Sequence, residues 1–435
     1  MMSPGADGLR ADRPGRVELA LAALTLFMFT EAYLAKLLAP NAADASAADA
    51  ASGFLRVLWL PFYGFILLGL IAAGRRTLET LARSPLLCLL GALALASTLW
   101  SIDPGLTFRR SVALIATTLL GVYLAARYDW LSALRLLAGM WGVLLLVTFL
   151  ATLAFPGFGV MQEVHPGAWA GGWWEKNTMG GHAARAALLF AFLAWRDDPL
   201  RRIWVVASVL AVVLVGLSTS ATALLGTLLG FGVLAAAAWM RQGKRFALFL
   251  VWVAGVVIGG LLIAYLLAPD AVLGLVGKDA TFTGRTDIWN ELLRSIAQRP
   301  LLGFGYMAYW APDSAPRFWL VEALEWNAPS GHNGWLDLAI SVGLVGVAVF
   351  AVDLCVSVTR GARLALRSPT GVLALGFFAQ FLLFAMSESI ILGQNSIIWA
   401  TYAFFSAKLA MEARETIPRP GVRLVERPRS PVAAE

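Results

Sequence analysis

Long apolar runs, separated by short polar segments, make up most of the chain. A helix that crosses the hydrocarbon core of a bilayer needs roughly 20 predominantly apolar residues. About twelve runs reach or approach this length, and they cover residues 17–39, 54–73, 85–100, 111–126, 131–155, 183–195, 203–219, 222–240, 246–268, 333–359, 369–387 and 396–411. The pattern predicts an all-α polytopic integral membrane protein with about twelve transmembrane helices.

The composition excludes a water-soluble enzyme of this length. Hydrophobic residues make up 59% of the 435 residues and charged residues only 14%, whereas soluble domains are about 45–50% apolar and about 25% charged. Too little polar surface is present to cover the chain in water. The two cysteines, Cys88 and Cys355, lie inside apolar runs, so neither a disulfide framework nor a cysteine metal site is indicated.

Basic residues fall in short clusters between the apolar runs, which indicates membrane topology and not nucleic-acid binding, despite the net charge of +7. Lys and Arg are enriched in cytoplasmic loops. With the N-terminus in the cytoplasm, most of the 34 basic residues lie inside. The predicted organisation is a cytoplasmic tail (1–16), transmembrane helices 1–9 with short loops (17–268), a long periplasmic loop (269–332), transmembrane helices 10–12 (333–411) and a basic cytoplasmic tail (412–435).

The long outer loop carries two candidate catalytic residues, Arg285 near its helical segment and His332 at its end. Ser330 is a candidate N-cap for the following helix. A histidine in the first turn of that helix feels the positive end of the dipole, which disfavours protonation and leaves the imidazole available as a base. A snorkelling arginine and a histidine that bonds at the interface remain the alternatives. Ile288, Leu292 and their neighbours recur on one face, so we expect this segment to lie flat at the membrane interface.

Other polar residues of the outer segments are candidates for substrate binding. Arg109 and Arg110 break the positive-inside pattern and would suit a lipid diphosphate, although a salt bridge with Asp103 is an equal alternative. Glu388 flanks the last outer turn; it is a functional candidate, but pairing with an outer arginine is the favoured interpretation. The remaining candidates are Lys176, Asn177, Arg185, Arg299 and Asn333.

Two tryptophans precede Lys176 and Asn177 in the second outer segment. Trp173 and Trp174 beside amide and charged groups would suit a sugar ring, which offers both apolar faces and hydroxyl groups. The alternative is an aromatic belt at the membrane interface.

These motifs resemble the O-antigen ligase and polymerase superfamily of bacterial membrane glycosyltransferases. The pattern is Gly-Arg-x-x-x-Trp, then Arg-Pro-x-x-Gly-x-Gly, then His-Asn-x-x-Leu with a Gly-x-x-Gly tail. It is carried by Gly284, Arg285, Trp289, Arg299, Pro300, Gly303, Gly305, His332, Asn333, Leu336, Gly343 and Gly346. Trp-Ser-Ile-Asp-Pro at 100–104 and Ser-Glu-Ser at 387–389 also occur in members associated with exopolysaccharide polymerisation.

The resemblance implies a GT-C-type glycosyltransferase in the bacterial inner membrane. Such an enzyme transfers a glycan from undecaprenyl diphosphate to a sugar hydroxyl on the periplasmic face. The acceptor is lipid A-core in the ligases of lipopolysaccharide biosynthesis and a second carrier-linked glycan in the polymerases. Membrane lipids and other polysaccharide assembly proteins are the further partners expected.

The residues fit this chemistry without a cofactor. Fixed arginines stabilise the charge that develops on the diphosphate, and His332 is placed to accept the acceptor proton. The outer loops contain no Asp-x-Asp cluster or His/carboxylate metal box, so we expect no metal. No Gly-x-x-x-x-Gly-Lys-Ser/Thr loop is present, which argues against ATP hydrolysis.

Two other classes of protein remain as alternatives. A transporter or flippase of a lipid-linked glycan would place charged residues near the middle of the membrane. Most ionisable groups lie at the outer face, which favours surface chemistry, but Glu31, Lys36 and Arg56 are not explained by it. A purely structural or assembly role does not account for the loop with Arg285 and His332.

The topology gives a first prediction. We expect residues 284–332 outside and both termini inside, because the basic residues divide in that way. Reporter fusions after residues 280 and 430 measure the two sides. Both reporters on one side of the membrane would refute the topology and, with it, the placement of every candidate residue.

Overall fold

The computed structural model describes residues 14–38, 53–163, 165–240, 285–325 and 328–415. Within these ranges the chain is helical, and the one strand-like pairing is an isolated bridge between Val160 and Trp169. The main helices are α1 (Arg16–Met28), α2 (Leu34–Leu38), α4 (Gly53–Leu58), α5 (Leu60–Ala73), α6 (Arg75–Arg83), α7 (Pro85–Ala96), α8 (Pro104–Arg127), α9 (Trp130–Ala154), α10 (Pro156–Gly159), α11 (Lys176–Arg196), α12 (Arg201–Leu217), α13 (Ala221–Met240), α16 (Arg285–Gln298), α17 (Ala315–Leu324), α18 (Gly334–Ala365), α19 (Pro369–Ala385) and α20 (Ile397–Glu415).

The predicted apolar runs are helical where the structure describes them, and α6, α10, α16 and α17 are further helices outside these runs. Each predicted run except 246–268, which lies outside the described residues, contains a helix. Four described helices, α8, α9, α13 and α18, are long and apolar enough to cross a membrane, and α6 with α7 forms a fifth if this bent pair is one span. The all-helical membrane architecture is confirmed, while the count of twelve spans stays a prediction.

The core forms where the long helices pack face to face. α8 packs against α20, α11 against α12 and α13, and α19 against α13 and α18. Large aromatic side chains fill the spaces between them, including Phe350, Phe381, Trp399 and Tyr402, all of which are fully buried. These contacts hold α18, α19 and α20 as one rigid group, and candidate residues lie at or next to neighbouring ends of these three helices.

α18 is interrupted at Val342 and Gly343, and the loop from Pro300 to Gly305 docks into the break. Phe304 N donates to Ile340 O at 2.9 Å and Gly305 N to Ser341 O at 3.0 Å, while Leu344 N donates to Pro300 O at 2.8 Å. Gly343 has φ 70, and a Cβ there would collide with the Leu301 carbonyl. The glycines of the predicted motif are therefore needed for close backbone contact between this loop and α18.

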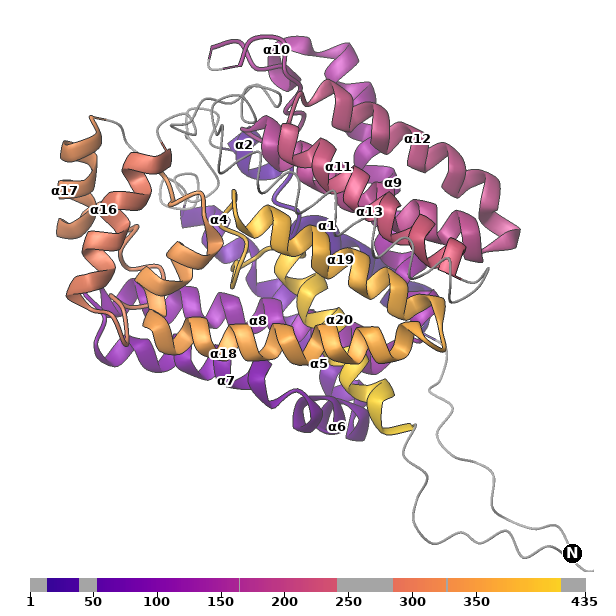
Figure 1. Cartoon of the computed structure of the whole chain (residues 1–435), viewed down its shortest axis with the longest axis horizontal. Helices are drawn as coiled ribbons and strands as arrows, with labels where there is room; N and C mark the ends of the chain where they lie inside the picture. Colours follow the sequence, from indigo (N-terminus) through magenta and orange to yellow (C-terminus); the bar gives the residue numbers. More distant parts are fainter. Residues whose placement is uncertain (1–13, 39–52, 164, 241–284, 326–327, 416–435) are drawn as a thin grey trace, which may run out of the picture.

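α16 and α17 stand at one end of the molecule in Figure 1, next to the start of α18. The apolar face of α16, formed by Ile288, Leu292 and Ile296, is buried against Phe304, Tyr309 and Ile340. The apolar face of this segment therefore packs on protein and not on lipid, while its position at the membrane interface stays a prediction. The apolar residues of α16 contact protein because the loop between α16 and α17 packs against them.

Gly121 allows the closest approach of α8 and α20 and gives a second prediction. A Cβ at Gly121 would lie 2.5 Å from Ala400 O and 2.6 Å from Phe404 N, and these backbone atoms cannot move aside. Gly121→Ala should lower the free energy of unfolding by about 1–3 kcal/mol, since overpacking strains a close helix contact. Thermal unfolding of the purified protein in detergent measures the change.

Gly139→Ala in α9 is the matched control, because a Cβ at Gly139 meets nothing within 4 Å. This variant should unfold at or above the temperature of the unmodified protein, since alanine favours a helix over glycine. Equal losses in the two variants would show that the α8–α20 contact is not tight.

Candidate functional site

Two cavities meet at one end of the helices. The smaller, called here the His332 cavity, has a volume of about 320 Å³ and is lined by segments from the α1–α2 junction, the start of α11, the loops before α17 and α18, and the turn between α19 and α20. The larger, called here the Arg109 groove, has a volume of about 930 Å³. Arg110 and Gln394 line both cavities, so the two spaces are neighbours.

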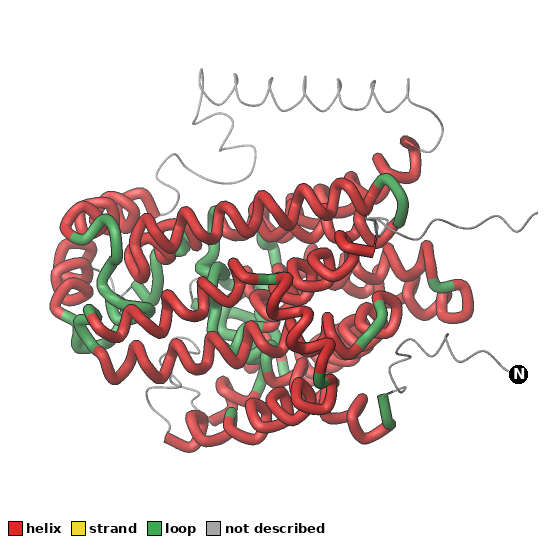
Figure 2. Tube along the Cα trace, turned by 90° about the horizontal axis from the view of Figure 1, so that it is seen from below, coloured by secondary structure: helices red, strands yellow, loops and turns green. Residues whose placement is uncertain are grey.

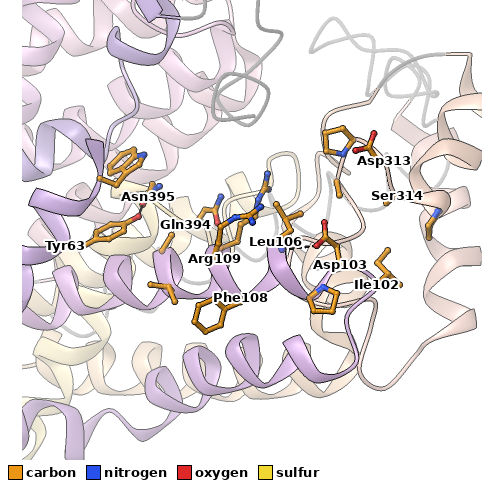
Figure 3. A pocket seen from close by; sticks show the side chains of 18 of the residues that line it. Tyr63, Ile102, Asp103, Leu106, Phe108, Arg109, Asp313, Ser314, Gln394 and Asn395 are labelled. Atoms are coloured by element: carbon orange, nitrogen blue, oxygen red, sulfur yellow. Dashed lines mark hydrogen bonds between the residues drawn. The ribbon is translucent and has the colours of Figure 1, made fainter. Parts of the chain in front are cut away.

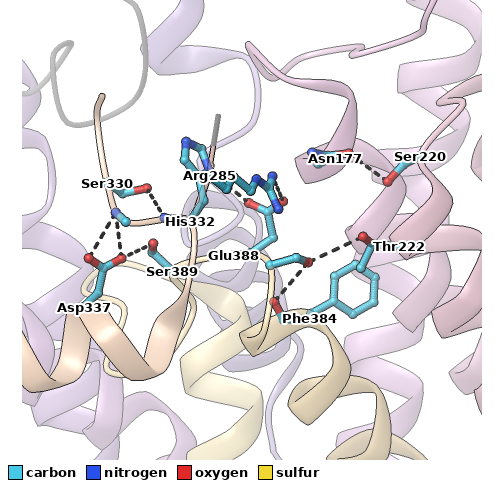
Figure 4. Close-up of polar contacts among 12 residues, drawn as sticks. Asn177, Ser220, Thr222, Arg285, Ser330, His332, Asp337, Phe384, Glu388 and Ser389 are labelled. Carbon is cyan, nitrogen blue, oxygen red and sulfur yellow. Dashed lines mark hydrogen bonds and ion pairs between the residues drawn. The ribbon is translucent and has the colours of Figure 1, made fainter. Parts of the chain in front are cut away.

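His332, Glu388 and Arg285 lie close together at the His332 cavity (Figure 4). Glu388 Oε1 lies 3.7 Å from Arg285 Nη2, and Glu388 Oε2 lies 4.0 Å from His332 Nδ1. All three side chains are mostly buried. The structure thus brings together the two predicted catalytic residues, and it confirms the favoured interpretation that Glu388 pairs with an outer arginine.

His332 is held in a form that can accept a proton. Burial and, second, the positive charge of Arg285 lower the pKa of His332 to about 4. The neutral imidazole therefore prevails at neutral pH.

The predicted helix cap is corrected: Asn333, not Ser330, caps α18. Asn333 Oδ1 accepts hydrogen bonds from Trp335 N at 3.0 Å and Leu336 N at 3.3 Å.

Asp337 is a site residue that the sequence analysis did not single out. Its carboxylate accepts hydrogen bonds from Trp310 Nε1 at 3.0 Å, from Gly331 N at 3.1 Å and from Ser389 Oγ. One side chain thereby ties the loop before α17, the loop that carries His332 and the last outer turn to α18. An acidic residue in the first turn of an apolar helix was the available signal.

Arg109 and Arg110 are placed at the Arg109 groove, as the sequence interpretation requires. Figure 3 shows Arg109 between Asp103 on one side and Gln394 on the other. The Asp103 carboxylate accepts a hydrogen bond from Leu106 N at 2.9 Å and so caps α8. Leu60, Phe108 and other apolar side chains line the same groove and are exposed, which gives it both a cationic and an apolar part.

Arg185 and Arg299, both predicted to bind substrate, line neither cavity. Arg185 is 3% exposed and its guanidinium lies 4.2 Å from the centre of the Phe384 ring, one turn before Glu388. Arg299 is exposed, donates to Trp100 O at 3.4 Å and covers the Phe304 ring. Arg299 therefore holds the 300–305 loop in place, and Arg185 packs against Phe384, one turn before Glu388.

Lys176 and Asn177, also predicted to bind substrate, hold the turn between α12 and α13. Lys176 Nζ donates to Thr219 Oγ1 at 3.3 Å, and Asn177 Oδ1 accepts a hydrogen bond from Ser220 Oγ at 2.8 Å. Asn333 follows His332 directly in the chain, and its side chain caps α18. Direct substrate contact by these three residues stays a prediction.

Unusual backbone conformations gather around the two cavities. Non-glycine residues with positive φ that line a cavity are Glu31, Met307, His332, Leu392 and Asn395. Each such residue costs on the order of 1–3 kcal/mol, and the cost persists only where the surroundings fix the conformation. This concentration of strain is typical of functional sites.

Part of the chain matches a known family. The family described as O-antigen ligase matches residues 206–351, which include Arg285 and His332. The chain is also 28% identical over 360 residues to the exopolysaccharide production protein ExoQ of Rhizobium meliloti (strain 1021), a match that covers 79% of this chain and 76% of that protein. The chain is thus similar to the O-antigen ligase family over residues 206–351 and to an exopolysaccharide production protein over most of its length.

The buried imidazole of His332 gives a third prediction. If neutral His332 is the required form, kcat/KM should fall only as the pH drops towards about 4, where His332 becomes protonated. Protonation removes the lone pair that accepts a proton, so activity is lost on the acid side. A pH profile of glycan transfer by the purified protein measures this. An acid limb centred near the ordinary histidine pKa of about 6.5 would contradict it.

Proposed function

We propose that this protein is a glycosyltransferase that moves a glycan from an undecaprenyl diphosphate carrier to a sugar hydroxyl at the periplasmic face of the inner membrane. The observation that carries the proposal is the placement of His332, neutral and mostly buried, beside Glu388 and Arg285 in a cavity adjacent to the Arg109 groove. A base, fixed cations and a groove with an apolar part are the three elements that a lipid-diphosphate donor requires.

In the proposed reaction His332 removes the proton from the acceptor hydroxyl. The acceptor oxygen then forms a bond to the anomeric carbon of the donor glycan, and the bond from that carbon to the diphosphate oxygen breaks. The electron pair leaves with the diphosphate, and the proton remains on His332 until solvent removes it. Glu388, with Oε2 4.0 Å from His332 Nδ1, stabilises the imidazolium that forms.

The arginines supply the charge stabilisation in this proposal. Arg110 lines both cavities and Arg109 lines the groove, so a diphosphate at their junction would meet two guanidinium groups. Exposed apolar residues along the same groove, such as Leu60, Phe108 and Val112, suit the isoprenoid part of the carrier. The glycan would then extend into the His332 cavity, where the acceptor hydroxyl is activated.

The similarity to an exopolysaccharide production protein favours exopolysaccharide as the product. Under this proposal the acceptor is a second carrier-linked glycan. Ligation to lipid A-core is the alternative reaction in the same family. Supplying purified protein with one acceptor at a time distinguishes polymerisation from ligation, because only the acceptor that the protein uses gains the glycan.

Removal of the proposed base gives the fourth prediction. His332→Ala should reduce turnover by about 10²–10⁴-fold, the usual contribution of general-base catalysis, while donor binding stays nearly unchanged. The measurement is transfer from an undecaprenyl-diphosphate-linked glycan by the purified variant. A loss of turnover without a loss of affinity separates a chemical role from a binding role.

His165→Ala is the control, because His165 is exposed and lines neither cavity; it should keep full activity. His182 lines the His332 cavity but stacks on Trp173 at 4.8 Å between ring centroids, so His182→Ala should lose stability first. If folded His332→Ala keeps most of its activity while folded His182→Ala has none, His332 is not the base.

The source of charge stabilisation gives the fifth prediction. Transfer by the unmodified protein should continue at a similar rate in excess chelator, because arginines stabilise the leaving diphosphate. In a separate variant, Arg285→Lys should lower the rate of transfer, since an ammonium cannot reproduce the planar geometry with which a guanidinium binds a carboxylate or a phosphate. Complete loss of transfer in chelator, restored by magnesium or manganese, would refute metal independence.

A further inference from the structure

Gln394 is a polar residue at the meeting point of the two cavities, and the reaction proposed above gives it no role. It lies in the turn between α19 and α20 and lines both the Arg109 groove (Figure 3) and the His332 cavity. Its side-chain Oε1 is buried, and no donor reaches this oxygen among the described residues. A buried amide oxygen is costly unless a donor completes it. The atom therefore marks a place where a ligand can supply the missing hydrogen bond.

The turn that carries Gln394 is held by hydrogen bonds from other parts of the chain. Tyr306 Oη donates to Leu392 O at 2.5 Å, and Tyr63 Oη donates to Asn395 Oδ1 at 2.5 Å. Leu392 and Asn395 both have a left-handed backbone, each with φ 53. Such conformations persist only where the surroundings fix them, so the backbone of this turn keeps Gln394 at the junction.

A second polar atom without a partner lies in the His332 cavity. Trp174, from the segment before α11, lines this cavity, and its Nε1 is buried without a hydrogen-bond partner among the described residues. An indole N–H only donates, whereas the amide oxygen of Gln394 accepts. The cavity thus presents a donor and an acceptor from two segments that are far apart in the chain. A sugar, with several hydroxyl groups, can complete both.

The position of Gln394 fits the sugar that is linked directly to the carrier. In the proposed reaction the diphosphate meets Arg109 and Arg110, and the glycan extends into the His332 cavity. The anomeric carbon joins these two parts of the donor, so it lies where the cavities meet, and Gln394 lines both cavities there. The nearest group of the sugar that can donate is the one on C2, because the ring oxygen on the other side of the anomeric carbon has no hydrogen.

We propose that Gln394 is a specificity-determining residue whose Oε1 binds the C2 hydroxyl or C2 amide of the carrier-linked donor sugar. The inference rests on the glycan transfer proposed above. A donating group on C2 completes the buried amide oxygen, whereas a sugar without such a group leaves this oxygen unpaired. In glycosidases, hydrogen bonds at C2 strengthen as the oxocarbenium-like transition state forms, and we expect the same of the contact with Gln394.

The test uses Gln394→Met, which keeps the side-chain length and removes both hydrogen-bonding groups. The full-length protein in lipid nanodiscs is titrated with undecaprenyl diphosphate glucose and with its 2-deoxy analogue, and binding is followed by tryptophan fluorescence. The unmodified protein should bind the donor with the C2 hydroxyl about 10-fold more tightly or better. Gln394→Met should remove most of this preference by weakening the binding of that donor alone.

Gln162→Met is the matched control, since Gln162 is exposed and lines neither cavity; it should keep the preference. Gln394→Met should unfold at the temperature of the unmodified protein, because Oε1 has no partner among the described residues. A clear loss of stability would show that the amide is bonded within the protein, which overturns the assignment. Equal preference in Gln394→Met and the unmodified protein, or no preference in the unmodified protein, also overturns it.

Transfer assays with the same two donors test the proposed function separately. Selective binding of the donor with the C2 hydroxyl, lost in Gln394→Met but without transfer to any acceptor, supports the assignment of Gln394 and refutes the transferase. Transfer from both donors without a preference in binding or in kcat/KM supports the transferase and refutes the assignment of Gln394.

Discussion

The docking of the 300–305 loop into the break of α18 is the contact on which the candidate site depends. A helix that breaks inside an apolar protein leaves backbone groups without partners, and such groups are costly unless other backbone completes them. Here Pro300, Phe304 and Gly305 provide those partners. The same contact fixes the start of α18, and with it His332 and Asp337.

The buried carboxylates of the site each have defined partners. Glu388 lies between Arg285 and His332, and Asp337 is satisfied by Trp310, Gly331 and Ser389. Buried ionic groups contribute little to net stability after desolvation. Their concentration at one end of the bundle therefore fits the proposed catalysis and substrate recognition better than a role in folding.

Backbone strain and the side-chain packing that stabilises it lie in different parts of the molecule. Residues with positive φ surround the cavities, while the aromatic core between α18, α19 and α20 supplies the packing that keeps them in place. The opposite ends of the helices are tied by separate ion pairs, such as Glu18 with Arg127 and Asp197 with Arg135. A rigid bundle can thus hold a preorganised cavity at one end.

The sequence by itself determined the helical membrane architecture and the positions of most long helices, because apolar runs are local properties of the chain. It also singled out His332 and Arg285, which the fold brings to one carboxylate, Glu388. Only the tertiary structure decided which polar residues reach the cavity. Arg299, Lys176 and Asn177 were candidates from the sequence but bond to neighbouring loops, whereas Asp337 and Glu31 line the cavity. A side chain's direction and partners depend on segments far away in the chain, which no local pattern records.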